Sequence, residues 1–276
     1  MKIVSSGRVL NSREFYEKKK KRRIIKLVLL FVGLLAFFSS LVYLSRQERF
    51  LITEVTVSGE NVVGKEEIIS RVKDLLRGRY LWIVPRTNAL VFPRSTIKES
   101  LLAEFPRFKS VSLDLDGFHN LFISLEERIP FALYCAKIDT AECYFLDEDG
   151  FIFVLAPSFS SDAVYFVYTT EGSLVNPLGD RFMPVGEFKM LSSFIKNLAV
   201  LNVYPVGLEV GDDKYSLLLP KGGEILWRKT DNLTVIHSNL EAFLSNDSIR
   251  AQNNFLDNII YLDLRTENKI FYKLKE

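Results

Sequence analysis

The sequence has few residues of the types that most often carry catalysis or bind metals. Of its 276 residues only two are histidine, His119 and His237, and only two are cysteine, Cys135 and Cys143. A Ser-His-Asp triad therefore has little choice of base, and a metal site rich in histidine has no ligands to draw on. The sequence also has no glycine-rich loop that would cradle a phosphate group. We therefore expect no cofactor, and binding is favoured over catalysis as the function.

Serine residues supply the one enzymatic alternative. Ser-x-x-Lys occurs three times, beginning at Ser70, Ser95 and Ser193, and residues 221–223 faintly resemble the Lys-Thr-Gly element of penicillin-binding transpeptidases. Such a nucleophile needs its lysine and its companion motifs in one cleft, and the sequence has no Ser-x-Asn element. Each of these serines also falls on an amphipathic segment as an ordinary polar residue. These observations disfavour a membrane-anchored cell-wall enzyme, such as a serine transpeptidase, and it is kept only as the alternative.

The longest apolar segment is residues 24–44. Within it, residues 27–44 are eighteen consecutive residues without a charge. A helix of this length and its flanks, rising about 1.5 Å per residue, crosses a hydrocarbon core of roughly 30 Å. A signal peptide has a shorter apolar region, of about 7–15 residues, and no small-x-small cleavage site follows here. We therefore expect a single transmembrane helix, which makes the lipid bilayer the first partner.

Charge is distributed unevenly about this segment. Ten of the 36 basic residues but only two of the 34 acidic residues lie before residue 45. Positive flanks stay in the cytoplasm, so the amino terminus is expected inside and residues 45–276 outside the plasma membrane. The outer part then holds 26 basic and 32 acidic residues, which argues against a nucleic-acid partner. Residues 1–23 are predicted to be a disordered basic tail, and residues 45–51 a linker.

Residues 52–127 predict five elements in the order strand, helix, helix, strand, strand. Apolar periodicity places these elements at 52–58, 65–77, 95–105, 109–115 and 120–126. Ser95 is the expected N-cap of the second helix, and Asp116 and Gly117 form the expected turn between the last two strands. This order is similar to that of the polypeptide-transport-associated (POTRA) fold. Such a unit buries two amphipathic helices on one face of a three-stranded sheet.

Residues 128–276 predict a β-rich domain with two helices, so the fold class of the chain is α+β. The helices are expected at 187–201 and 231–245, the second with Asp231 as its cap. Short alternating segments predict strands at 131–134, 144–153 (with a turn at Asp149 and Gly150), 164–168, 207–210, 215–219, 224–227, 259–265 and 270–273.

Two short motifs carry a more specific resemblance. Glu-Glu-Arg-Ile-Pro at 126–130 closes the POTRA-like unit and is followed by an apolar strand and by Tyr-Phe-Leu-Asp-Glu-Asp-Gly-Phe-Ile-Phe at 144–153. Near the end of the chain, Asp-Leu-Arg at 263–265 precedes a turn and one last strand. In this order, over about residues 24–276, the chain resembles the FtsQ/DivIB cell-division family. The resemblance implies a bitopic, non-enzymatic scaffold at the septum, which helps to control septal peptidoglycan synthesis by binding FtsB/FtsL-like single-pass proteins.

The resemblance also implies a partner-binding site at an exposed edge strand near the carboxyl terminus. Main-chain hydrogen bonds would supply affinity there, and alternate side chains specificity. Arg265 is the expected salt-bridge donor to an acidic partner, although Thr266 stands where the family often has an aromatic residue. The other expected contacts are Asn268, Ile270 and Tyr272 on one face of the last strand, Phe271 on the other, and Lys214 as a weaker basic candidate.

Other interpretations of the same features stay open. Sheet edges commonly carry charges simply to prevent aggregation. A free edge and a single spanning helix also permit self-association. POTRA units serve protein translocation as well, although those are normally tandem and joined to a β-barrel.

Both cysteines lie in the part of the chain expected outside the membrane. Cys135 and Cys143 are symmetrical about Asp139, so a hairpin turning there would place them opposite each other. Facing residues of antiparallel strands have Cα atoms about 4.5–5.5 Å apart, within the range that a disulfide tolerates. We expect a disulfide, given an oxidising compartment. The alternative is a pair of small buried apolar side chains.

Overall fold

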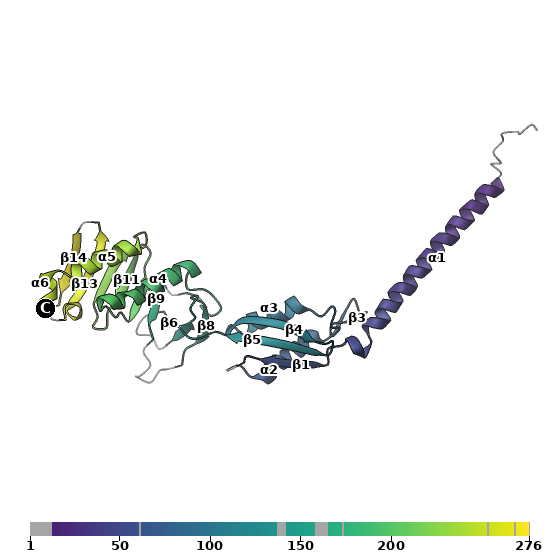
Figure 1. The fold of residues 1–276 in the computed structure, drawn as a ribbon, viewed down its shortest axis with the longest axis horizontal. Coiled ribbons are helices and arrows are strands. Elements are labelled where there is room, and N and C mark those ends of the chain that lie inside the picture. Colours follow the sequence, from purple (N-terminus) through teal and green to yellow (C-terminus); the bar gives the residue numbers. More distant parts are fainter. Residues whose placement is uncertain are drawn as a thin grey trace, which may run out of the picture. The chain divides into compact units, whose positions relative to one another are not determined.

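The structure is a computed structural model that describes residues 13–60, 62–136, 142–157, 165–172, 174–252, 254–267 and 269–275. Its elements form a mixed α+β fold with one amino-terminal apolar helix and a large sheet-rich carboxyl-terminal region, which confirms the predicted fold class at this level (Figure 1). The described residues separate into two compact units. The first holds residues up to Lys98 together with 112–124, and the second holds 99–111 and 125 onward.

The apolar segment forms α1 (Arg13–Ser45), which is long and apolar enough over Tyr16–Ser45 to cross a membrane. The prediction of a disordered tail is wrong for residues 13–23, because they continue this helix. Lysine, arginine and glutamate are good helix formers, and adding residues to an existing helix avoids the cost of nucleation. Residues 1–12 of the predicted tail lie outside the described part of the chain.

The segment 45–51, predicted as a linker, has local structure of its own. It contains the short 3₁₀ helix η1 (Glu48–Phe50). Its backbone is also bonded to a later loop: Ala89 N–H donates to the Phe50 carbonyl at 2.8 Å, and Leu51 forms an isolated β-bridge with Asn88. These bonds hold the chain that follows α1 against the loop near residue 88.

The elements between residues 54 and 127 follow the predicted order, with one short hairpin added between the two helices. They are β1 (Glu54–Ser58), α2 (Lys65–Leu76), the hairpin strands β2 (Arg79–Tyr80) and β3 (Val84–Pro85), α3 (Arg94–Glu104), β4 (Phe108–Asp116) and β5 (Asn120–Glu127). The three longer strands form a sheet in the order β1-β5-β4, in which β1 runs parallel to β5. Ser95 lies inside the first turn of α3 and is not its N-cap, because the helix begins at Arg94 and Ile97 N–H donates to the Pro93 carbonyl at 3.0 Å.

A nine-stranded sheet dominates the second unit. Its strands are β6 (Ala132–Cys135), β7 (Cys143–Leu146), β8 (Ile152–Leu155), β9 (Val167–Thr170), β10 (Gly207–Val210), β11 (Lys214–Leu218), β12 (Glu224–Arg228), β13 (Ile259–Thr266) and β14 (Lys269–Leu274). They are arranged in the order β14-β13-β12-β11-β10-β9-β6-β7-β8, so β14 and β8 form the two edges (Figure 1). The strand predicted at 164–168 overlaps β9 only at residues 167 and 168: residues 165 and 166 are not in a strand, and residue 164 lies outside the described residues.

Helices cover one face of this sheet. They are α4 (Val185–Asn197) with the 3₁₀ extension η2 (Leu198–Leu201), α5 (Leu233–Leu244), the short α6 (Asp247–Arg250) and the 3₁₀ turn η3 (Phe255–Asp257). Their apolar residues form one core with alternate residues of the strands. At its centre Trp227 is fully buried, with ring centroids 5.5 Å from Phe194 and from Tyr215. This core determines which side chains of each strand face the helices.

The cap predicted for α5 is wrong by one residue. Asn232, not Asp231, is the N-cap, and its side chain accepts a hydrogen bond from Thr234 N–H at 2.9 Å. Asp231 instead accepts from the backbone N–H of Arg228 at 2.8 Å and so closes the turn after β12. Both residue types accept backbone hydrogen bonds equally well, so local sequence does not choose between them.

Candidate functional site

The last strand, β14, offers a free sheet edge. It pairs with β13 in antiparallel register on one side, and no described strand follows it on the other. Lys275 N–H donates to the Asn258 carbonyl at 2.8 Å, so the backbone groups of residue 275 face β13. Because these groups alternate in direction along a strand, those of residues 270, 272 and 274 point outward. An added strand would find these three donors and acceptors along the edge.

The side chains of β14 divide between two faces. Ile270 packs against the main core, and the ring of Tyr272 lies 5.7 Å from Phe243 of α5 and 5.4 Å from Phe255 of η3. Phe271 points to the opposite face and is 51 % exposed. Ile270 is therefore partly covered by the core of the same unit, whereas Tyr272 packs beside these rings and still has 42 % of its surface exposed to a partner. Asn268, the fourth expected contact of this strand, lies outside the described residues.

Arg265 is engaged within its own strand. Its Nε donates to Asp263 Oδ1 at 2.9 Å and its Nη2 donates to Asp263 Oδ2 at 2.6 Å. Residues two apart on a strand share a face, which allows this two-point contact. The hydrogen bond from the Arg265 side chain is the main cause that holds the pKa of Asp263 below its usual value. The salt bridge that the sequence assigned to a partner carboxylate is therefore formed internally.

Lys214 lies away from the edge. It begins β11, which is separated from β14 by two strands, and it faces Arg228 of β12 in the ladder. Its Nζ lies 3.8 Å from Glu171 Oε1. The structure thus does not bring Lys214 together with β14, although both belong to the same sheet.

The two sequence motifs at the start of this unit meet in a buried ion pair that the sequence did not predict. Arg128 Nη1 donates to Asp147 Oδ2, and the two side chains are only 10 % and 3 % exposed. Arg128 Nε also donates to the Pro106 carbonyl at 3.1 Å, and its guanidinium lies 3.9 Å from the centroid of Phe151. Asp147 Oδ1 accepts from the N–H groups of Asp149 and Phe151, both at 2.9 Å. These contacts tie Arg128, directly after β5, to the turn directly after β7, and we interpret them as structural.

Further ion pairs, partly open to solvent, lie near this buried pair. Lys109 Nζ lies 2.9 Å from Glu148 Oε1 and 3.7 Å from Glu126 Oε1. Lys189 Nζ lies 2.6 Å from Asp149 Oδ1, and this hydrogen bond is the main cause that lowers the pKa of Asp149. Gly150 completes the turn at φ +73°, as the sequence predicts.

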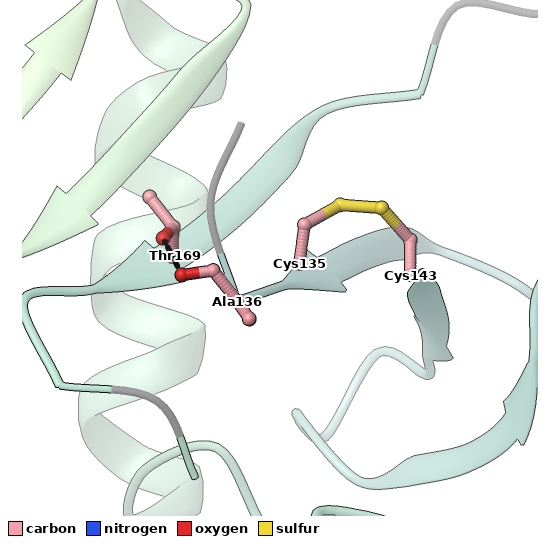
Figure 2. The surroundings of a disulfide bond; sticks show 4 residues. All are labelled: Cys135, Ala136, Cys143 and Thr169. Carbon is pink, nitrogen blue, oxygen red and sulfur yellow. Dashed lines mark hydrogen bonds between the residues drawn. A yellow bond between two sulfur atoms is a disulfide. The ribbon is translucent and has the colours of Figure 1, made fainter. Parts of the chain in front are cut away.

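The two cysteines face each other in the structure. Cys135 of β6 pairs with Cys143 of β7, the two Cα atoms lie 4.3 Å apart, and the sulfur atoms are bonded (Figure 2). The next residue, Ala136, accepts a hydrogen bond at 3.4 Å from the Thr169 hydroxyl on the neighbouring strand β9. The disulfide lies on the face of the sheet opposite the main core, in a small second cluster with Phe145 and Phe153. The turn expected at Asp139 lies outside the described residues.

The residues of the enzymatic alternative are only partly brought together. Ser70 lies on α2 and Ser95 on α3, whereas Ser193 of α4 and His237 of α5 line one shallow hollow with Asn197 and Thr234. Within the described part of the chain, Ser193 and His237 share no hydrogen bond, and no three His, Cys, Asp or Glu side chains are grouped as metal ligands. The sequence did not predict that Ser193 and His237 line the same hollow, since they lie on separate helices.

No protein-family model matches the chain, and no curated protein matches its sequence.

Proposed function

We propose that this protein is a non-enzymatic scaffold of bacterial cell division, of the FtsQ/DivIB type. In this proposal α1 anchors the chain in the plasma membrane with its amino terminus in the cytoplasm. The elements β1, α2, α3, β4 and β5 together make up a POTRA domain, and the nine-stranded sheet presents the binding site. The protein links cytoplasmic and extracytoplasmic division proteins at the septum by binding FtsB/FtsL-like single-pass partners.

The observation that carries this proposal is the free edge of β14. Residues 270, 272 and 274 direct their backbone groups outward, and a partner strand can satisfy all of them by extending the sheet. Phe271 supplies an exposed aromatic side chain at the centre of the same strand. The exposed Lys269 and Lys273 flank it, so the edge favours a partner strand with acidic side chains.

The opposite edge of the sheet provides a matched control. Leu155 ends β8 and is 53 % exposed, close to the 51 % of Phe271. A glutamate at either position replaces an exposed apolar side chain on an edge strand, so both variants should fold equally well. We expect Phe271→Glu to remove the partner contact, since it deletes the aromatic ring and repels an acidic strand. Leu155→Glu should leave it intact.

The experiment is co-purification of the full-length chain from its own cells. Small single-pass proteins with extracytoplasmic coiled coils should accompany the wild type and the Leu155→Glu variant, and should be lost with Phe271→Glu. A fluorescent fusion should concentrate at midcell. Equal recovery with both variants would show that β14 is not the interface. If no such proteins accompany the wild type, the division role itself is wrong.

A separate variant tests the enzymatic alternative. Replacing Ser70, Ser95 and Ser193 together by alanine should leave growth unchanged. Loss of viability in a triple variant that still folds would favour a cell-wall enzyme over the scaffold.

A further inference from the structure

The β2–β3 hairpin has an apolar tip that nothing within its own unit covers. Leu81 and Trp82, at the turn, are 86 % and 90 % exposed, and Ile83 beside them is also exposed. Leu90 and Val91 add two more exposed apolar side chains a few residues later. Single exposed apolar residues are ordinary, but several on one short loop mark a binding surface.

The backbone of this tip is also unusual for a turn. Leu81 and Trp82 have φ values of +45° and +66°, in the left-handed region that turns normally fill with glycine or asparagine. A loop selected only to reverse the chain would place small residues at these two positions. The chain instead places there two of the three most exposed large apolar side chains of the described residues, which indicates that the tip contacts something apolar.

Hydrogen bonds tie this tip to the end of α1. Arg46 follows the last helical residue and donates from Nε and Nη2 to the Ile83 carbonyl, at 3.1 and 3.0 Å. The buried Asn88 donates from Nδ2 to the Ser45 carbonyl at 2.8 Å, and its Oδ1 accepts from Leu90 N–H at 2.9 Å. The loop therefore lies within direct contact of the residues at which the apolar helix ends.

This position defines the depth of the tip in a membrane. The uncharged stretch that ends at Leu44 is eighteen residues long, which at about 1.5 Å per residue covers roughly 27 Å, slightly less than a typical hydrocarbon core. Residues just beyond it then lie at the boundary between lipid tails and head groups. Tryptophan is enriched at that boundary, because its ring is apolar and its N–H can still reach a hydrogen-bond acceptor.

The charge of the loop fits the same surface. Residues 78–93 contain Arg79 and Arg86 and no acidic residue, whereas the chain beyond α1 has more acidic than basic residues. Arg77, just before them, forms an ion pair with Asp74 at 2.9 Å and adds little net charge. Basic side chains next to a spanning helix are attracted to anionic lipid head groups. The apolar tip and its basic surroundings therefore match one occupant, an anionic bilayer surface.

We propose that residues 78–92 form a second membrane contact, in which Leu81 and Trp82 insert into the boundary of the bilayer that α1 crosses and Arg79 and Arg86 bind anionic head groups. This contact holds the first unit against the membrane surface instead of leaving it on a swinging tether. It requires that α1 spans the bilayer, and it does not depend on the division role.

The two tryptophans of the chain allow a direct test, because Trp82 is exposed and Trp227 is fully buried. The full-length protein is reconstituted into vesicles of phosphatidylcholine and phosphatidylglycerol, in which the acyl chains carry bromine near the head group. We expect the bromines to quench most of the Trp82 emission, measured as the difference between wild type and Trp82→Phe. The remaining Trp227 emission should be unchanged. Trp82→Phe alters an exposed tip, so its circular dichroism should match the wild type.

Two outcomes of the quenching experiment would overturn the proposal. Emission of Trp82 that bromolipid leaves unchanged and that a water-soluble quencher reduces would place the tip in water. Protection from both quenchers would place it against protein, such as a second copy of the chain, and would also contradict a lipid contact. Arg79→Glu should weaken the bromolipid quenching in anionic vesicles, whereas Lys98→Glu on α3 should not. Equal effects of these two variants would refute the head-group contact.

Discussion

Replacing Arg128 by methionine should strongly destabilise the second unit. The substitution keeps most of the apolar volume but leaves the Asp147 carboxylate buried without its cation. In the structure the two side chains are 10 % and 3 % exposed, so the guanidinium supplies most of the solvation that the carboxylate has in the folded protein. The change also removes the hydrogen bond to the Pro106 carbonyl and the contact with the Phe151 ring.

The expected decrease in unfolding free energy follows from the burial of the ion pair between Arg128 and Asp147. Removing one member of a buried ion pair typically costs about 3–5 kcal/mol, because the other charge stays buried and unpaired. Asp147 keeps two backbone donors on Oδ1, so the lower part of that range is expected for Arg128→Met. Adding Asp147→Asn should restore part of the loss, since asparagine can still accept those two hydrogen bonds and carries no charge. The pair should therefore show a favourable coupling energy of about 1–3 kcal/mol in a double-mutant cycle.

The assay is urea unfolding of the full-length chain in nanodiscs, followed by the fluorescence of Trp227 in the Trp82→Phe background. Trp227 lies in the core of the same unit, so its emission reports the unfolding of that unit. Lys109→Met serves as a control, because its contacts with Glu148 and Glu126 are open to solvent and should matter far less. The reasoning is refuted if Arg128→Met costs no more than Lys109→Met, or if the two members of the pair behave additively.

Three further predictions use the same unfolding assay. Reduction of the disulfide between Cys135 and Cys143, whose sequence separation is 8, should lower the unfolding free energy by about 2.5 kcal/mol, because the unfolded chain regains the entropy of the closed loop. In the variant with alanine at both positions, reductant should have no effect. Gly150→Ala should lower the unfolding free energy by about 2–4 kcal/mol, because alanine is strained at positive φ and its Cβ would lie 2.8 Å from a Phe188 ring carbon. Gly117→Ala is the control: Gly117 has φ +68° but open space around it, so only the backbone strain, about 1–2 kcal/mol, should be lost. Asp263 has a lowered pKa in the folded protein, so its charge stabilises the fold at pH values above the unfolded pKa of about 4, and this contribution is lost as the pH falls further. The difference in unfolding free energy between wild type and Asp263→Asn should therefore shrink below that pH. A difference that does not change with pH would contradict the ion pair.

Local patterns predicted most elements of the fold. The eighteen uncharged residues before residue 45 lie within α1, and the alternation at 259–265 lies within β13. The register of Cys135 and Cys143 is observed as well. Each of these features depends on neighbours within one helix, strand or hairpin, and such neighbours are set by the period of the element.

Features that depend on residues far apart in the sequence are harder to predict from local patterns. The nine-stranded order places the last strand, β14, at one edge and β8 at the other, and no local pattern determines that order. The ion pair of Arg128 and Asp147 connects residues 19 positions apart, and nothing in the two motifs that contain them predicts this contact. The hairpin β2–β3 has two-residue strands, which are too short for an alternating pattern to indicate.

The internal contact of Arg265 changes what the sequence could say about a partner. An arginine near a free edge suggests a salt bridge across the interface, but here both oxygens of Asp263 already hold the guanidinium. A partner carboxylate would have to displace Asp263 or share the remaining donors, so the net gain is small. The outward backbone groups of β14 have no such internal competitor among the described strands. Affinity at this edge should therefore come mainly from the main chain and Phe271, which is why Phe271→Glu is a sharper test of the interface than Arg265→Glu.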